Sequence, residues 1–200
     1  MYRLFYNRPL SGDVLFLLIA PEKTPTSYLR KGNVTALYHE EELIGYNIFD
    51  LKEVMKLKSK GILFAPDDKL VDVVNALLQE EGFAPLPYTR DSGYKVAKVV
   101  RLEKHPWDEN KSIVTLSLGN ETLTTDTAYR NLIPGSLVVI AMDGCILADG
   151  RLFRESAVRG IPHQADICSG KDLRIDEECE KAFLPNEGEK EGDDFFLGGE

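Results

Sequence analysis

The residues of this 200-residue chain that could do chemistry are concentrated between Arg159 and Lys171, where two cations, an imidazole and a thiol stand close together. A Cys168 thiolate with His105 or His163 as its base would form a nucleophile pair. Cys168 follows an apolar residue and precedes a small one, a context that favours a buried thiol. We therefore predict that the chain is not an enzyme.

The spacing of the cysteines, histidines and glycines does not support a metal site or a nucleotide-binding site. A zinc site would have to combine Cys145, His163, Cys168 and Cys179, which show no Cys-x-x-Cys or His-x-x-x-His spacing. A Gly-rich loop followed by Lys-Ser/Thr, the signature of a phosphate cradle, is also missing. We expect no metal and no cofactor. The odd number of cysteines, three, is typical of reduced thiols and predicts a cytoplasmic protein.

The net charge of −9 is distributed unevenly along the chain. Residues 175–200 hold 10 acidic and 2 basic side chains, whereas residues 94–174 hold 10 acidic and 11 basic ones. The middle of the chain is therefore almost neutral. A neutral domain can still bind RNA through a local basic face, although long-range attraction would contribute little.

The elements that must position these groups begin with an α+β module over residues 1–88. Its longest apolar run, Val14–Ala20, is too short to span a membrane and predicts a central strand instead. Five apolar residues at helical spacing between Leu70 and Leu78 predict a helix that packs on the sheet. The expected elements are an edge strand around Tyr2–Tyr6, a strand Val14–Ala20, a hairpin of Val34–His39 and Leu43–Phe49, and a helix Asp68–Glu81.

A second module is expected over residues 89–174, after a proline-rich break at Phe83–Pro87. Short apolar strands alternate there with turn signals such as Gly119-Asn120. Five such strands predict an all-β barrel, either an OB-fold or another small barrel. The expected strands are Lys95–Glu103, Ser112–Leu118, Glu121–Thr125, Ser136–Met142 and Leu152–Val158.

Several short motifs follow one another in a recognisable order. They are Glu103–Pro106, Gly119–Leu123, Pro134–Ala141, Leu147–Leu152, Arg159–Ile161 and Ile167–Ser169. This order resembles the tRNA-binding domain of the phenylalanyl-tRNA synthetase β chain and of the methionyl-tRNA synthetase C-terminus. With Gly45–Asp50 included, the whole chain resembles the YtpR-type tRNA-binding proteins. The resemblance implies an OB-fold that holds the outer corner of tRNA by shape, without catalysis, and often as a homodimer.

The resemblance also bears on the acidic C-terminal extension, residues 175–200. The extension contains two apolar groups, Ala182–Pro185 and Phe195–Leu197, which argue against full disorder. Family members carry a short strand and a closing turn in the matching positions. We therefore expect the extension to pack on the barrel with its acidic residues outward.

The predicted function is non-catalytic binding of tRNA or another structured RNA, as an accessory to translation and with no membrane partner. Phosphate and ribose require donors, and bases require flat surfaces such as Trp107 and Tyr129. The predicted RNA-binding residues are Lys98, Lys104, Lys111, Arg130, Arg154, Arg159, His163, Ser169 and Lys171.

One alternative function stays open. The segment His163–Asp166 stands where the family has Ser-x-Gly-Met at its RNA surface, and Trp107–Lys111 also departs from the family pattern. A chain rewritten at these positions could be a protein-interaction or dimerisation module that kept the OB-fold and lost RNA affinity.

Overall fold

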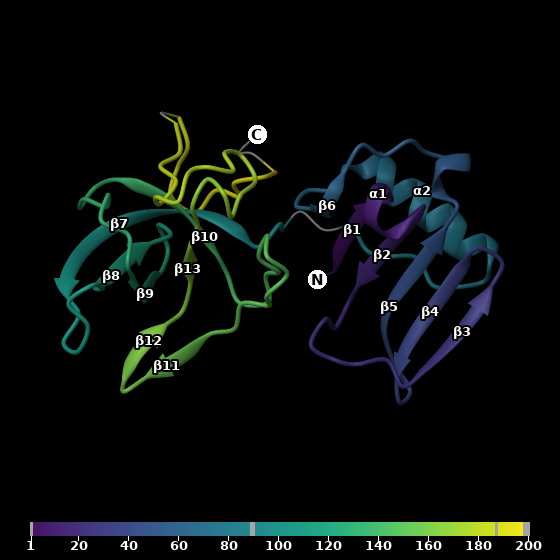
Figure 1. Ribbon diagram of the computed structural model, residues 1–200, viewed down its shortest axis with the longest axis horizontal. Coiled ribbons are helices and arrows are strands. Elements are labelled where there is room, and N and C mark those ends of the chain that lie inside the picture. The colour runs from purple at the N-terminus through teal and green to yellow at the C-terminus, as the bar shows by residue number, and fades with distance from the viewer. Residues whose placement is uncertain (1, 89–90, 187, 198–200) are drawn as a thin grey trace. The chain divides into compact units, whose positions relative to one another are not determined.

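Two β-sheets organise the chain, one in each of its two units. The structure is a computed structural model that describes residues 2–88, 91–186 and 188–197. The units are Met1–Arg90 and Asp91–Glu200, and each is drawn in Figure 1. Residues 175–200 belong to the second unit. Within the described residues, the helices are all too short or too polar to cross a membrane.

The first unit is an antiparallel sheet of six strands in the order β3-β4-β5-β2-β1-β6. Its strands are β1 (Arg3–Asn7), β2 (Val14–Leu18), β3 (Ser27–Lys31), β4 (Val34–His39), β5 (Glu42–Phe49) and β6 (Lys60–Leu63). The helices are α1 (Arg8–Ser11), the 3₁₀ helix η1 (Leu51–Glu53) and α2 (Asp68–Glu80). Helix α2 begins at the capping Asp67, whose carboxylate accepts a hydrogen bond from the Leu70 amide at 2.8 Å.

The core of the first unit lies between α2 and one face of the sheet. Leu70, Val74 and Leu78 of α2 are buried against Leu15 and Ile48 of the sheet. The hairpin β4–β5 and helix α2 occur where the sequence predicts them.

The position of β1 differs from its prediction. The prediction of an edge strand is wrong, because β6 pairs with the outer side of β1, with Phe5 opposite Ile62. Strand β6 has no polar–apolar alternation from which a strand could have been predicted.

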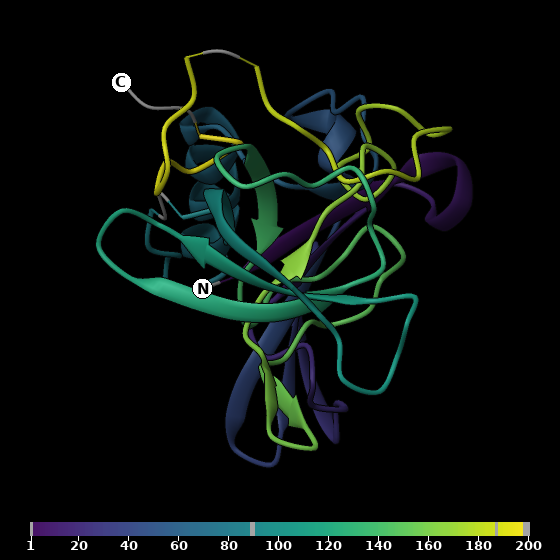
Figure 2. The same ribbon diagram turned by 90° about the vertical axis from the view of Figure 1, so that its left-hand side faces the viewer.

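The second unit is mostly β and contains a nearly closed barrel built on five strands. The strand order is β13-β10-β7-β8-β9, and Figure 2 shows these strands in a view turned by 90° from that of Figure 1. The strands are β7 (Tyr94–Lys104), β8 (Ser112–Ser117), β9 (Thr122–Thr127), β10 (Leu137–Ala141) and β13 (Asp166–Ile167). A separate hairpin, β11 (Ser156–Val158) and β12 (Ile161–His163), lies between β10 and β13 in the chain, and β12 contacts β9.

The expected strand Leu152–Val158 is shorter than predicted. Residues Ser156–Val158 alone form β11, because Leu152 and Phe153 turn back onto the preceding loop. Leu152 forms a bridge with Ile146, and the Phe153 amide donates to the Cys145 carbonyl at 2.8 Å. The fifth strand of the barrel sheet is instead β13.

The C-terminal segment adds an edge to β7 beyond the end of β8. The Gly192 amide donates to the Val96 carbonyl at 2.8 Å, and the Val96 amide donates to the Asp193 carbonyl at 2.9 Å. Gly192 has φ +93°, and a Cβ at this position would lie 2.6 Å from the Leu118 carbonyl oxygen, so the close approach requires glycine. The acidic segment is therefore a paired part of the second unit.

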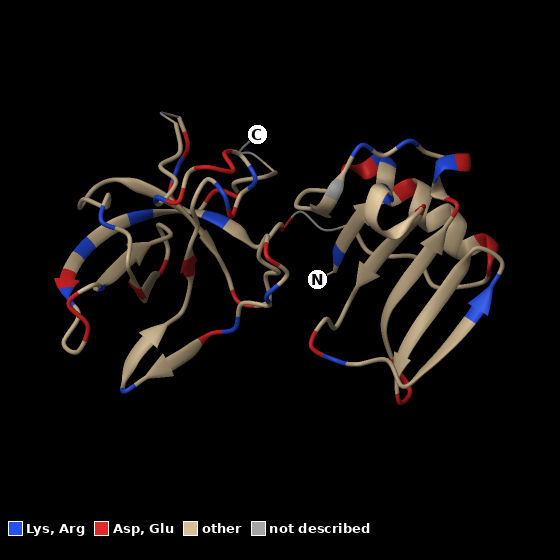
Figure 3. Ribbon diagram, viewed as in Figure 1, with Lys and Arg blue, Asp and Glu red and all other residues tan. Residues whose placement is uncertain are grey.

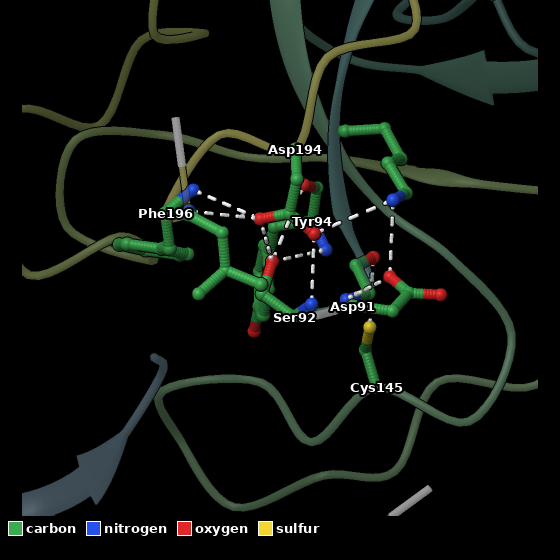
Figure 4. A network of polar contacts seen from close by, with 9 residues as sticks. Asp91, Ser92, Tyr94, Cys145, Asp194 and Phe196 are labelled. Carbon is green, nitrogen blue, oxygen red and sulfur yellow. Dashed lines mark hydrogen bonds and ion pairs between the residues drawn. The ribbon is translucent and has the colours of Figure 1, made fainter. Parts of the chain in front are cut away.

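Asp194 fastens this segment to the start of β7 (Figure 4). Its carboxylate accepts from the Ser92 amide at 2.8 Å, the Ser92 hydroxyl at 2.7 Å and the Leu197 amide at 3.0 Å. The Lys95 ammonium lies 3.3 Å from Asp194 and 3.1 Å from Asp91. Burial alone would lower the pKa of Lys95, but the two carboxylates outweigh it and raise this pKa.

Candidate nucleic-acid interface

The loop that joins β7 to β8, residues 105–111, is the centre of the candidate site. Its backbone closes on itself, because the His105 amide donates to the Lys111 carbonyl at 3.4 Å and the Lys111 amide donates to the Asp108 carbonyl at 3.1 Å. The Asp108 carboxylate also accepts from the Asn110 amide at 2.9 Å. The loop therefore presents its side chains from a fixed backbone.

Trp107, the one tryptophan of the chain, projects from this loop with 54 % of its surface exposed. Its amide donates to Nδ1 of His105 at 3.3 Å, and the two rings meet edge to face with centroids 5.9 Å apart. The guanidinium carbon of Arg159 lies 5.7 Å from the centre of the indole ring, a cation–π contact. Two residues 52 positions apart in the sequence thus place a guanidinium against an exposed indole.

The β11–β12 hairpin carries Arg159 to Trp107. Val158 pairs with Ile161, which leaves Arg159 and Gly160 as a two-residue turn. Both have positive φ, +50° and +82°, as a type I′ turn requires. Arg159 adopts this conformation without the help that glycine gives, at a cost of roughly 1–2 kcal/mol.

A hollow of about 270 Å³ lies beside the loop. It is lined by His105, Asp108, Lys111, Asp126, Ser156, Val158, Ile161 and His163. Asp126 receives two cationic or polar neighbours there: Nζ of Lys111 at 2.6 Å and Nδ1 of His163 at 3.0 Å. Burial alone would raise the pKa of Asp126, but Lys111 and His163 outweigh it and lower this pKa.

The orientation of His163 is set by Thr125 of β9. The Thr125 hydroxyl donates to the Ala165 carbonyl at 2.6 Å, and its oxygen lies 2.8 Å from Nδ1 of His163. Because the hydroxyl has a single hydrogen, Nδ1 must be the donor in the second contact. Thr125 and Asp126 thus hold the Nδ1 edge of the His163 ring.

Five of the nine predicted RNA-binding residues gather around the 105–111 loop. Lys104 directly precedes it, and Arg130 donates to the Glu109 carbonyl at 3.1 Å. Lys111 and His163 border the hollow, and Arg159 covers Trp107. Strands distant in sequence bring these groups to one end of the barrel.

The other four predicted residues lie elsewhere in the second unit. Lys98 borders a different hollow with Lys190 and Glu191. Arg154 pairs with Asp143 at 3.1 Å, and Lys171 pairs with Glu180 at 3.5 Å. Ser169 is buried, and its hydroxyl donates to Asp172 at 2.7 Å.

Tyr129, expected to offer a stacking surface, is partly buried instead. Its hydroxyl donates to Asp172 at 3.4 Å, and burial together with the charge of Asp172 raises the pKa of Tyr129 to about 12. Its ring packs against the barrel core. Sequence reasoning also missed Asp126 and Thr125, which position Lys111 and His163; their place in the alternating run Thr122–Thr127 predicts a strand but not this role.

Cys168 and the two histidines considered for nucleophilic chemistry each make other contacts. Cys168 is buried, its thiol contacts the Asp166 carbonyl at 3.6 Å, and burial raises the pKa of Cys168 well above its usual value. Nδ1 of His163 is engaged by Thr125 and Asp126, and Nδ1 of His105 by the Trp107 amide. Across residues 2–88, 91–186 and 188–197, no group of three His, Cys, Asp or Glu side chains is arranged to hold a metal ion.

Comparison with known proteins gives a similarity along nearly the whole chain. The "Putative tRNA-binding protein YtpR" of Bacillus subtilis (strain 168) is 29 % identical over 197 residues, which cover 96 % of this chain and 98 % of that protein. The resemblance predicted from the sequence is confirmed. Residues 21–86 match a family described as "Domain of unknown function (DUF4479)".

Shorter similarities reach part of a much larger protein. The "Phenylalanine--tRNA ligase beta subunit" of Leptospira interrogans serogroup Icterohaemorrhagiae serovar Lai is 32 % identical over 92 residues, 46 % of this chain and 11 % of that subunit. The subunit from Wolinella succinogenes is 30 % identical over 78 residues, 39 % of this chain and 10 % of the subunit. The chain thus spans about a tenth of the length of these two ligase subunits.

Proposed function

We propose that the second unit is an OB-fold that binds tRNA or another structured RNA without catalysis, as a cytoplasmic accessory to translation. The OB-fold assignment is supported by the order of pairing. Strand β7 pairs with β8 and β10, β8 pairs with β9, and β13 pairs with β10. Strand β9 is the third strand of the barrel in chain order. The segment after β10 returns to it through β12, which contacts β9, as closure of the barrel requires.

The observation that carries the function is the meeting of two loops. In OB-folds the loops between strands 1 and 2 and between strands 4 and 5 bind oligonucleotides. Here the corresponding segments are the 105–111 loop and the β10–β13 connection. They touch where Arg159 covers Trp107. The proposed binding loops are therefore also the segments that bring the predicted cations together.

The electrostatic contribution of this interface is modest. Lys104, Arg130 and Arg159 are exposed, whereas Lys111 is held by Asp126. About three phosphate contacts would give a slope of log affinity against log salt of about −2 to −3. Figure 3 shows acidic residues in this unit next to the basic residues of β7, in agreement with a site that is not strongly positive.

Titration of bulk tRNA into the protein at several salt concentrations tests the proposal. We expect a linear fall of log affinity with log salt, with the slope given above. The double variant Lys104→Ala/Arg130→Ala should reduce the magnitude of the slope by about 1.5, because two phosphate contacts are lost. The matched control, Lys98→Ala/Lys171→Ala, removes two lysines distant from the loop and should leave the slope unchanged. An equal effect of both double variants would contradict the placement of the interface.

The alternative function, a protein-interaction or dimerisation module, is favoured by one observation. Val158, on the β11–β12 hairpin, has 65 % of its surface exposed beside the candidate site. Sedimentation equilibrium would detect a homodimer. A stable dimer that shows no tRNA binding in dilute buffer, and that dissociates in Val158→Lys, would replace the RNA-binding proposal by this one.

A further inference from the structure

We infer that the interface recognises an unpaired nucleotide, whose base stacks at the Trp107–Arg159 pair, rather than the surface of a paired stem. This inference rests on the proposed RNA binding and specifies the structural class of RNA. The Trp107–Arg159 pair is the one indole of the chain together with the guanidinium that lies above it.

The first step of the argument is the exposure and the fixation of Trp107. With 54 % of its surface exposed, the indole offers a flat aromatic face of the kind on which bases stack. The backbone of Trp107 is fixed by its amide contact with His105 and by the hydrogen bonds that close the loop. The indole itself packs edge to face against the His105 ring and under the Arg159 guanidinium. Little conformational entropy would therefore be lost when a base stacks on it.

The second step is the position of Arg159. Its guanidinium carbon lies 5.7 Å from the centre of the indole, and Arg159 itself stands in the strained turn at the tip of the β11–β12 hairpin. Bases stack on aromatic rings and on Arg guanidinium planes alike. Within a paired stem both faces of each base are covered by its neighbours, so a stacking surface of this kind is accessible to an unpaired base but not to a base in the interior of the stem.

The third step is the chemistry of the adjacent hollow. Two carboxylates, Asp108 and Asp126, line it, and Val158 and Ile161 form apolar walls. The carboxylates would repel a phosphate, and the positive charge of Lys111 is already satisfied by Asp126. The hollow thus suits the N–H-bearing edge of a base, since a carboxylate accepts hydrogen bonds from such an edge.

The flanking cations complete the arrangement. Lys104 precedes the loop, and Arg130 contacts it through the Glu109 carbonyl. Both are exposed, and neither lines the hollow. They are placed to meet the phosphates on either side of an extruded base, which is where the negative charge of an unpaired nucleotide lies.

The intrinsic fluorescence of Trp107 gives a direct test, because no second tryptophan contributes to the signal. An RNA hairpin with an unpaired loop would be compared with a fully paired blunt duplex that has the same number of nucleotides. We expect the hairpin to quench the fluorescence and to bind about tenfold or more tightly than the duplex. The duplex should leave the fluorescence nearly unchanged.

Variants separate stacking from general RNA affinity, with binding followed by the anisotropy of labelled RNA. Trp107→Ala should weaken hairpin binding roughly 5- to 150-fold, the range for loss of one base–aromatic stack. Trp107→Phe should retain part of the affinity. Tyr28→Ala, which removes an exposed aromatic side chain from the first unit, is the matched control and should bind like the unchanged protein. Circular dichroism would verify that each variant is folded.

The outcomes distinguish this inference from the proposed function. Equal affinity for hairpin and duplex, with Trp107→Ala unaffected, would overturn the stacking inference and leave RNA binding intact. Equal weakening of both RNAs by Trp107→Ala would overturn the selectivity for unpaired nucleotides. The absence of binding to every RNA at low salt would overturn both proposals.

Discussion

Asp194 and Asp126 each bind a lysine of the second unit, yet the two carboxylates have different surroundings. Asp194, whose side chain is 9 % exposed, is surrounded by backbone amides and by a hydroxyl at the start of β7. Asp126 is bound by Lys111 and His163, whose side chains border a hollow. An acceptor saturated by backbone groups has no capacity left for a ligand, whereas side-chain donors can exchange partners. The first cluster therefore joins segments, and the second can take part in recognition.

The largest expected effect comes from breaking the Asp194 cluster. Asp194→Ala would leave buried Ser92 donors without their acceptor, and we expect a loss of about 2–4 kcal/mol in the free energy of unfolding. Urea denaturation measures it. The neighbouring Asp193→Ala, which removes a partly exposed carboxylate bound to the Lys190 amide, should cost less than about 1 kcal/mol. Equal losses in the two variants would show that the Asp194 contacts are not what holds the C-terminal segment.

A smaller effect is expected at Thr125, which supports the second cluster. Thr125→Val keeps the side-chain shape and removes both hydroxyl contacts, so the Ala165 carbonyl loses a donor and His163 loses a neighbour. We expect a loss of about 1–2 kcal/mol in unfolding free energy and a few-fold weaker binding of RNA. Thr124→Val, at the adjacent position of β9, should change neither quantity appreciably. RNA affinity that stays constant in Thr125→Val would mean that the orientation of His163 is irrelevant to binding.

The smallest effect is a pH-dependent one at Asp126. The pKa of Asp126 is lower than its ordinary value of 3.8, so the folded state releases this proton more readily than the unfolded state. The stability that the carboxylate contributes is present above that ordinary value and is lost as the pH falls through the folded pKa. Because the side chain of its partner Lys111 is 42 % exposed, we expect about 1 kcal/mol or less.

Comparison of Asp126→Asn with the unchanged protein in urea, at pH 7 and at pH 3, measures this contribution. The difference should be present at pH 7 and should be smaller at pH 3, which lies below the ordinary value of 3.8. Lys111→Met should show the same window, since it removes the partner of the same carboxylate. A difference that persists undiminished at pH 3 would indicate that shape rather than charge makes Asp126 matter.

The sequence predicted those elements whose apolar spacing and turn or capping residues lie within one short stretch of the chain. Helix α2 has its stripe of apolar residues and its cap in one stretch, and the β4–β5 hairpin alternates on both sides of its turn. Strand β6 has no such pattern, and it forms because its backbone pairs with that of β1. Strand β3 is exposed at every residue, so burial leaves no period in its sequence. Strand formation by pairing is a tertiary effect, which a single stretch cannot reveal.

The candidate site was predicted in the same incomplete way. Residue types indicated which side chains could contact RNA, and five of them meet at one end of the barrel. The alternation of side chains along a strand indicates the face of the sheet on which each one lies, but not which of them lie at the same end of the barrel. Lys98 and Lys104 lie six residues apart on β7, roughly 20 Å at 3.3 Å per residue. The contact between Trp107 and Arg159 depends on the closure of the barrel and on the hairpin turn, neither of which is a local property.

The pairing of the C-terminal segment with β7 has a consequence for the order of events during synthesis. Ser92 and Asp194 are separated by 102 residues. At the usual rate of 5–20 residues per second, the ribosome adds the second partner about 5–20 s after the first. The first unit contains all the strands of its own sheet well before that time. The sheet of the second unit, in contrast, is complete only after translation has reached the C-terminal segment that pairs with β7. In nascent chains stalled before Asp194, the β7 amides should therefore be less protected from hydrogen exchange than in complete chains.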